Sequence, residues 1–305
     1  YTCSYDFCNL IKLDENEFKL LISGNLKKND IFYQFVGIKE IKDKKIIKKE
    51  VQLISNHEII DYQNSKIIYD KKQYLIKELL PNLIEIKQLI PNSRIMLVGG
   101  SLENLKILAN FIPQPKNSNE KSFGTKGLTG CLNLIDMKFK NIDIEITNGN
   151  CEDGLNIIRS TGSINKLIAV DSSNDALDID FSDLKISKID VTSAGNDCVD
   201  LSFGKYEIEE ININDCGDKA ISVGEKSKLV INKLNALNSK IGIASKDSSK
   251  TKLENGYFKH LDTCLSAYNK KQEFIGGFIE INNFDCLNST NKIFVDDMSS
   301  INLNS

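Results

Sequence analysis

The 305-residue sequence contains no tryptophan and only two histidines, and its only arginines are Arg94 and Arg159. The forked cation that reads bases and phosphates is thus almost absent, so we expect no nucleic-acid partner. None of the eight cysteines forms a Cys-x-x-Cys pair, which argues against a structural zinc site. No apolar run approaches the ~18 residues of a membrane span, so we expect none in this chain.

Proline is scarce and one-sided, since Pro81, Pro91, Pro113 and Pro115 all precede residue 116. Proline lacks the N–H that a strand with neighbours on both sides must donate, so residues 116–305 are free to form a continuous ladder. Residues 131–305 carry 19 basic and 27 acidic side chains, a net charge of −8. The C-terminal part is therefore the acidic one.

The C-terminal part follows a 22-residue repeat. Small residues recur at Gly154, Ala176, Cys198, Ala220, Gly242, Cys264 and Cys286. The next position holds Leu155, Leu177, Val199, Ile221, Ile243, Leu265 and Leu287. Two positions further on lie Ile157, Ile179, Leu201, Val223, Ser245, Ala267 and Ser289. Apolar residues at a spacing of two mark a strand with one buried face.

A second apolar column follows in the later half of each unit, at Ile186, Ile189, Ile208, Ile211, Val230 and Leu234. A unit of two or more short strands buries its apolar face only by stacking on copies of itself. Leucine-rich repeats share the length but require a Leu/Asn consensus that is missing here. The pattern predicts an all-β parallel β-helix, with left-handed turn residues in segments such as Asn148-Gly149-Asn150 and Asn214-Asp215.

The repeat sets the expected domain boundaries. Residues 1–65 are Lys-rich and lack the period, so we expect a small N-terminal β region or cap. Residues 66–290 should form the β-helix, with irregular opening coils, a polar excursion at 113–127 and regular coils from about 131. The polar tail, 291–305, should cover the last coil, whose backbone groups would otherwise be unpaired.

One face of the predicted stack is acidic. Between the inward columns lie Asn156, Asp178, Asp200, Ser222, Ala244 and Ser266, with Asp180, Ser202, Gly224, Lys246 and Tyr268 beside them. A corner column holds Asp153, Asp175, Asp197 and Lys219. Side chains between inward positions should point to solvent. Carboxylates stacked about 4.8 Å apart repel one another, so stability alone does not favour the arrangement.

Two interpretations of this strip stay open. In the first, the side chains are solvated edge residues, with the corner carboxylates capping backbone N–H groups. In the second, the strip binds a ligand. Its catalytic residues would then be Asp175, Asp178, Asp197 and Asp200, its substrate-binding residues Asp180, Lys219, Lys246 and Tyr268, and its Ca²⁺ ligands Asp178, Asp180 and Asp200.

Four segments carry a resemblance: SNDALDID (173–180), GNDCVDLS (195–202), GDKAISVGEKS (217–227) and SKIGIASKDSS (239–249). They resemble the right-handed, pectin-lyase-like β-helix superfamily, and in particular β-helix regions of bacterial surface proteins that often accompany CotH-kinase-type domains. The resemblance covers roughly residues 70–290 and implies a right-handed solenoid. No kinase motif is present in this chain.

A more distant likeness is to polygalacturonase-type glycoside hydrolases. Asp175 falls at the aspartate of their NTD motif, Asp197 at the second aspartate of DD, and Lys246 at the lysine of RIK. Asn196, Lys219 and Ala244 replace the first aspartate of DD, the histidine of GHG and the arginine of RIK. The missing histidine and arginine favour binding or scaffolding over catalysis.

The cysteines predict at least one disulfide. Cys3 and Cys8 could close a short loop and are the first choice, and Cys264 and Cys286 share a phase in the repeat. Cys131 and Cys151 nearly do so. Stacked free thiols are the alternative, because a stacked pair is about 5 Å apart at Cβ, further than a disulfide prefers.

Together these features predict an extracellular or cell-surface module that interacts with polysaccharide, by binding or processing acidic glycans. A polysaccharide lyase, epimerase or glycoside hydrolase is one alternative. A non-catalytic structural or adhesion scaffold, whose acidic face ensures solubility, is the other.

Overall fold

A computed structural model describes residues 57–115 and 127–304. The predicted N-terminal β region, apart from its end, and the pair Cys3 and Cys8 lie outside the described residues. The opening part contains β1 (His57–Tyr62), β2 (Ser65–Asp70), β3 (Tyr74–Leu80), β4 (Leu83–Gln88), β5 (Ile95–Val98), β6 (Ser101–Glu103) and β7 (Lys106–Asn110). No helix occurs among the described residues.

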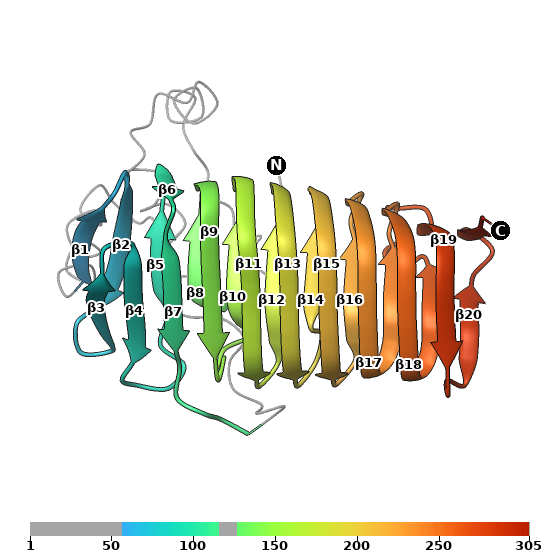
Figure 1. Cartoon of the computed structure of the whole chain (residues 1–305), viewed down its shortest axis with the longest axis horizontal. Coiled ribbons are helices and arrows are strands. Elements are labelled where there is room, and N and C mark those ends of the chain that lie inside the picture. Colours follow the sequence, from blue (N-terminus) through green and yellow to red (C-terminus); the bar gives the residue numbers. More distant parts are fainter. Residues whose placement is uncertain (1–56, 116–126, 305) are drawn as a thin grey trace, which may run out of the picture. The chain divides into compact units, whose positions relative to one another are not determined.

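The remaining strands stack one after another along the solenoid (Figure 1). They are β8 (Gly130–Ile135), β9 (Lys138–Thr147), β10 (Asp153–Ile158), β11 (Thr161–Ser172), β12 (Asp175–Asp180), β13 (Asp183–Ala194), β14 (Val199–Ser202), β15 (Lys205–Cys216), β16 (Lys219–Gly224), β17 (Lys228–Lys246), β18 (Lys250–Tyr268), β19 (Phe278–Leu287), β20 (Asn291–Val295) and β21 (Ser300–Leu303).

The strands form two parallel ladders. We call the first the strip ladder: it runs β5, β8, β10, β12, β14, β16, the second halves of β17 and β18, and β20. The second runs from β7 through β9, β11, β13 and β15 to the first halves of β17 and β18, then β19 and β21. Only the opening pairs β1–β2, β3–β4 and β2–β5 are antiparallel within the described part of the chain.

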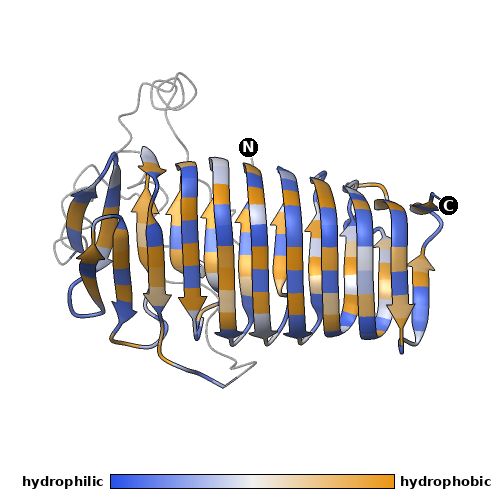
Figure 2. Cartoon of the chain, in the orientation of Figure 1, coloured by the Kyte–Doolittle hydropathy of each residue, from blue (hydrophilic) through white to orange (hydrophobic). Residues whose placement is uncertain are grey.

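The predicted inward column is confirmed. Leu177, Val199, Ile221 and Ile243 are Cα partners in successive strands, and all four are fully buried. Figure 2 shows the corresponding alternation of apolar and polar residues along the strands. The core therefore runs continuously along the inside of the stack, as the 22-residue repeat requires.

The second apolar column is confirmed except at Val230, which is 39% exposed while Ile231 is fully buried. The prediction was off by one position, because the preceding corner contains two residues of positive φ, Glu225 and Lys226, where the coil below has only Phe203. Lys205 therefore pairs with Lys228, one position beyond the one that the repeat indicates. The added corner residue shifts the inward positions of the first half of β17 by one, and the strip ladder returns to the 22-residue spacing where Lys219 pairs with Ile241.

The last coil is longer than predicted. Leu265 stacks on Ile293 and not on Leu287, so Leu287 and Ser289 do not extend the inward columns. The extra residues form the segment 269–277, which bends back over the preceding corner and is held there by Asp247, whose Oδ1 accepts backbone N–H groups from Lys270 and Lys271. The tail, expected to cover the last coil, holds β20 and β21, which pair with β18 and β19.

Left-handed residues mark the corners. Asn148 and Asp215 have φ values of 58° and 66°, as the turn chemistry predicted. A second corner column, at Asp136, Arg159, Phe181, Phe203 and Lys226, also has positive φ. Two bulky aromatics in this conformation are unexpected, because the left-handed region is costly for large side chains.

Three disulfides join the described cysteines, none of which is free: Cys131–Cys151, Cys198–Cys216 and Cys264–Cys286. The prediction of at least one disulfide is confirmed. The first cysteine of each pair lies in the strip ladder or in the turn before it. The second cysteine follows 18 to 22 residues later, near the corner that opens the next coil. The corner position brings the Cα atoms to 5.3–6.2 Å, a separation that a disulfide accommodates.

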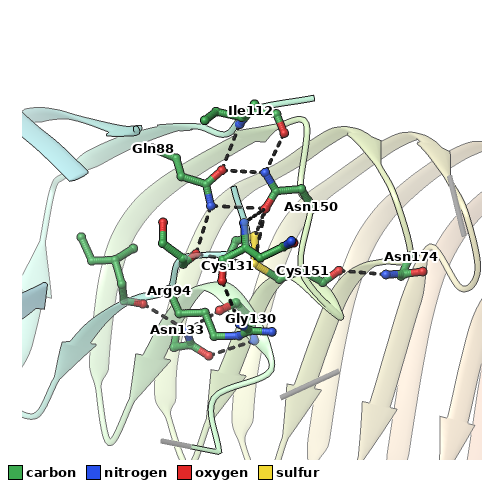
Figure 3. The surroundings of a disulfide bond; sticks show 12 residues. Gln88, Arg94, Ile112, Gly130, Cys131, Asn133, Asn150, Cys151 and Asn174 are labelled. Atoms are coloured by element: carbon green, nitrogen blue, oxygen red, sulfur yellow. Dashed lines mark hydrogen bonds between the residues drawn. A yellow bond between two sulfur atoms is a disulfide. The ribbon is translucent and has the colours of Figure 1, made fainter. Parts of the chain in front are cut away.

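A buried amide pair adjoins the first disulfide (Figure 3). Nε2 of Gln88 donates to Oδ1 of Asn150 at 3.2 Å, and Nδ2 of Asn150 donates to Oε1 of Gln88 at 2.6 Å. The backbone of Ile112 completes the set, since its oxygen accepts from Asn150 and its N–H donates to Gln88. Because these amide groups are satisfied, the opening coil tolerates them in its interior.

Candidate functional site

The strip ladder assembles the polar column in the predicted order. Asn156, Asp178, Asp200, Ser222, Ala244 and Ser266 are Cα partners from strand to strand. Asp178 and Asp200 are partly exposed, whereas the other four are buried. The prediction that the whole column faces solvent is thus wrong. Part of the reason is visible at Ser222, because the long side chain of Lys246 reaches its hydroxyl.

The corner column acts on the backbone. Oδ1 of Asp175 accepts the N–H of Asp197 at 2.8 Å and the side-chain amide of Asn196 at 2.7 Å. Oδ1 of Asp197 likewise accepts the N–H of Lys219 at 3.0 Å. Each of these carboxylates therefore caps a donor of the next coil, the structural role that the sequence left open.

Four carboxyl groups of the strip and its corner, those of Asp153, Asp175, Asp178 and Asp180, have a pKa above the ordinary aspartate value. Burial, with Asp197 nearby, raises the pKa of Asp175 to about 7. Burial, with Asp200 and Glu225 nearby, raises the pKa of Asp180 to about 7. Burial also raises the pKa of Asp153 and Asp178 well above the ordinary aspartate value, and neighbouring carboxylates add to the effect.

Asp197 differs because it has a cationic partner. Burial raises its pKa, but the Lys219 ammonium, 3.3 Å from Oδ1, opposes the rise. Lys219 also pairs with Asp218, and these carboxylates raise the pKa of the lysine despite its burial. The ammonium of Lys219 is thus occupied by two carboxylates.

Asn156 connects the corner to the middle of the strip. Its Nδ2 donates to Oδ2 of Asp178 at 2.7 Å and lies 3.4 Å from Oδ2 of Asp153. Its own Oδ1 is buried without a hydrogen-bond donor among the described residues, and so is Oδ1 of Asp200. This part of the strip therefore has more acceptors than donors.

The described residues contain no group of three or more His, Cys, Asp or Glu side chains close enough to hold a metal ion. Asp178, Asp180 and Asp200, the residues expected to bind Ca²⁺, share the strip but do not converge on one point. Their oxygens are spread over two coils instead.

The C-terminal half of the strip has a different character. Lys246 is 5% exposed, and its ammonium donates to Oγ of Ser222 at 2.7 Å. Within the two described ranges, no carboxylate lies at ion-pair distance from this ammonium. Tyr268 stacks one coil above Lys246. Burial raises the pKa of Tyr268 above its ordinary value, although the charges of Lys246 and Lys219 oppose the rise.

A hollow of about 430 Å³ opens beside Tyr268. Its lining consists of Ile241, Thr263, Ser266, Tyr268, Asn269, Phe294 and Asp296. Phe294 meets Tyr268 edge to face, with ring centroids 6.5 Å apart. Of these residues the sequence identified only Tyr268 as a site residue, because Phe294 and Asp296 reach the hollow through the lengthened last coil, which the 22-residue repeat did not predict.

The structure thus brings the predicted residues onto one ladder but divides them by charge. Asp178, Asp180 and Asp200 lie at one end, whereas Lys219, Lys246 and Tyr268 lie at the other. Asp175 and Asp197 lie at the corner, where one oxygen of each accepts a backbone N–H and Asp197 also pairs with Lys219. No arginine or histidine is among these residues.

No known protein family, curated protein or solved structure matches this chain. The described residues form no helix that is long and apolar enough to cross a membrane.

Proposed function

We propose that this chain is a secreted or cell-surface β-helix module that binds an acidic polysaccharide, with a uronate-type sugar held at Lys246 and Tyr268. The observation that carries the proposal is the buried ammonium of Lys246, which has a hydroxyl and no carboxylate as its direct partner among the described residues. A buried cation without a paired counter-ion is costly, and a sugar carboxylate would offset that cost.

The hollow beside Tyr268 supports the same ligand class. It combines an aromatic pair with the polar side chains of Thr263, Ser266 and Asn269. The carboxylate of Asp296 also lines it, and its oxygens accept the backbone N–H groups of Asn269 and Met298. Aromatic faces suit the C–H face of a pyranose, and a few polar groups fix its hydroxyls. One coil below, Lys246 would meet a carboxylate on the same or the next sugar.

The disulfides support the proposed location. Disulfides persist in oxidising compartments and are rare in the cytosol. Three closed pairs, with no free cysteine among the described residues, fit an exported protein. The likeness of the repeat to right-handed, pectin-lyase-like β-helices of bacterial surface proteins agrees with this location and with a polysaccharide ligand.

A second candidate function is acid–base processing of the bound polysaccharide. The observation that favours it is Asp180, a partly exposed carboxyl group whose pKa is raised by burial to about 7. A group with a pKa near the working pH suits general acid or base catalysis. A lyase, epimerase or hydrolase would then use Asp180 with its neighbours on the strip.

Calorimetric titration with an oligogalacturonate tests the binding proposal. Lys246→Met should weaken binding at least tenfold, because it removes the buried cation. Lys240→Met is the matched control, because the Lys240 side chain is 62% exposed and pairs with Asp218. The affinity of this variant for the oligogalacturonate should stay within twofold of wild type. Wild-type protein that binds no acidic oligosaccharide would refute the proposal.

An assay for new reducing ends and unsaturated products, run on the same substrate, tests processing. Asp180→Asn should abolish any product and leave binding in place. Product formation at the wild-type rate by this variant would exclude Asp180 as the acid or base.

A further inference from the structure

Apart from the amide of Asn156 and the protons that its own carboxyl groups retain, the acidic end of the strip has few hydrogen-bond donors. Asp178 and Asp200 are Cα partners in neighbouring strands, and Asp180 follows Asp178 on the same face. The amide of Asn156 donates to Asp178, and the described structure gives Oδ1 of Asp200 no donor. The charge of Lys271 offsets part of the rise in the pKa of Asp180, but the Lys271 ammonium is bound to Glu225 and does not contact Asp180.

Asn156 is an independent sign that a ligand is missing. Its side chain is 1% exposed and points into the acidic end through its bond to Asp178, yet its Oδ1 has no donor within the described ranges. Buried acceptors without donors are rare and costly in folded proteins. Two such atoms, on Asn156 and Asp200, flank the carboxyl group of Asp178.

The chemistry of the missing ligand follows from this imbalance. A uronate would add further negative charge, so the acidic end does not suit the sugar proposed for Lys246. A calcium ion requires six to eight oxygens within about 2.6 Å, whereas no three carboxylates of the described residues converge. The spread of acceptors over two coils suits a cation whose donors are themselves spread out, such as an ammonium with adjacent hydroxyl groups.

We propose that the acidic end of the strip binds the ammonium group of an amino sugar, with the partly exposed carboxyl groups of Asp178 and Asp200 as its direct acceptors. This inference rests on the proposed function and deepens it. The carboxylates and Lys246 lie on one ladder, with Asp200 two strands from Lys246 and thus about 10 Å away along the stack. The full ligand is then a polysaccharide that carries both amino and acidic sugars.

The first test compares two oligosaccharides that differ only at nitrogen. A glucosamine hexasaccharide should bind the wild-type protein, and its N-acetylated counterpart, which keeps the hydroxyl groups but lacks the ammonium, should bind at least tenfold more weakly. Because burial raises the pKa of Asp178 and Asp180, an arriving ammonium should displace protons. The calorimetric heat should therefore change with the ionisation enthalpy of the buffer.

The second test uses variants of the wild-type chain. Asp178→Asn and Asp200→Asn should each weaken glucosamine binding at least tenfold. Asp183→Asn is the matched control, because Asp183 is exposed and pairs with Lys205 on the other ladder, and it should stay within twofold of wild type. Circular dichroism confirms that each variant is folded.

The outcomes separate this inference from the proposed function. Glucosamine binding that survives Lys246→Met, together with no binding of oligogalacturonate, would overturn the uronate proposal alone. Equal binding of the N-acetylated oligosaccharide, or wild-type affinity in both aspartate variants, would overturn the amino-sugar inference. So would an Asp200-dependent response to spermidine or Ca²⁺ in the absence of any response to the glucosamine oligosaccharide.

Discussion

The rings of Phe181 and Phe203 stack face to face, with centroids 4.7 Å apart and an angle of 5° between their planes. Both residues occupy the same corner in successive coils, both have positive φ, and they are 54% and 42% exposed. A stacked pair contributes about 0.5–1.5 kcal/mol. A strained backbone conformation costs on the order of 1–3 kcal/mol per residue, so the stacking does not fully offset it.

This balance predicts that the two aromatics are dispensable for stability. The double variant Phe181→Asn, Phe203→Asn should be at least as stable as the wild-type chain, because asparagine tolerates the left-handed conformation and the lost stacking contributes less than the strain costs. Chemical denaturation measures the change. A loss well beyond that of ordinary surface substitutions would show that the rings stabilise the corner more than their backbone conformation costs.

A charge placed in the inward column should be far more damaging. Val199→Asp buries an unpaired carboxylate between Leu177 and Ile221, so the variant should lose several kcal/mol or fail to fold. Thr192→Asp, at an exposed position of β13, should be nearly neutral. Thermal unfolding followed by circular dichroism compares them, and a well-folded Val199→Asp variant would contradict the register.

The disulfides should contribute similar amounts to stability. Their loops span 18, 20 and 22 residues, and closing a loop of this length stabilises a chain by about 3 kcal/mol. Replacing Cys198 and Cys216 by serine should therefore cost as much as replacing Cys264 and Cys286. Mass spectrometry after alkylation without reductant should find no label on these four cysteines or on Cys131 and Cys151, and a label there would refute the pairing.

The raised pKa of Asp175 predicts how its removal depends on pH. The pKa is about 7 in the folded chain and 3.8 in an ordinary aspartate, so the folded state keeps a proton that the unfolded state releases. The stabilisation from that proton is complete below about pH 4 and is lost as the pH rises through 7. The melting temperature of Asp175→Asn, relative to wild type, should therefore rise from pH 5 to pH 8.

The control for this pH series is Asp183→Asn, which removes one exposed carboxylate from the other ladder. Its melting temperature relative to wild type should stay nearly level. A parallel response of the two variants would mean that net charge, rather than burial of Asp175, sets the slope.

Gly224 offers a way to move Lys246 without removing its charge. A Cβ at this position would lie 3.1 Å from Cε of Lys246, so Gly224→Ala should displace the lysine stem. Acidic-oligosaccharide affinity should fall severalfold, with little change in melting temperature. The comparison variant Ser222→Ala removes the hydroxyl that accepts from the Lys246 ammonium and fills no space. Wild-type affinity in Gly224→Ala would argue against the position of Lys246 in the proposed site.

The sequence was a good guide wherever the 22-residue spacing holds. Leu177 to Ile243 could be placed in the core because a buried column needs only an apolar residue at a fixed interval. The spacing could not place Ile231 or Phe294, because an extra corner residue and the segment 269–277 shift the register without changing the local pattern.

The site was predicted less completely, for a related reason. Strand parity put Asp178 and Asp200 on one ladder, but parity carries no information on how deeply a side chain is covered. It therefore missed the burial of Asn156 and of Lys246. It also left open whether Asp175 and Asp197 meet a ligand or the backbone, a choice that depends on corner geometry.

The spacing of the disulfides has a mechanical consequence. Cys131, Cys198 and Cys264 lie three coils apart, and each closes roughly one coil. A solenoid pulled from its ends peels coil by coil, releasing about 70 Å of extended chain for every 20 residues. A closed coil cannot be drawn out in this way. Under tension, therefore, only the roughly two coils between successive disulfides can extend. The disulfide-closed coils limit how far the described stack lengthens.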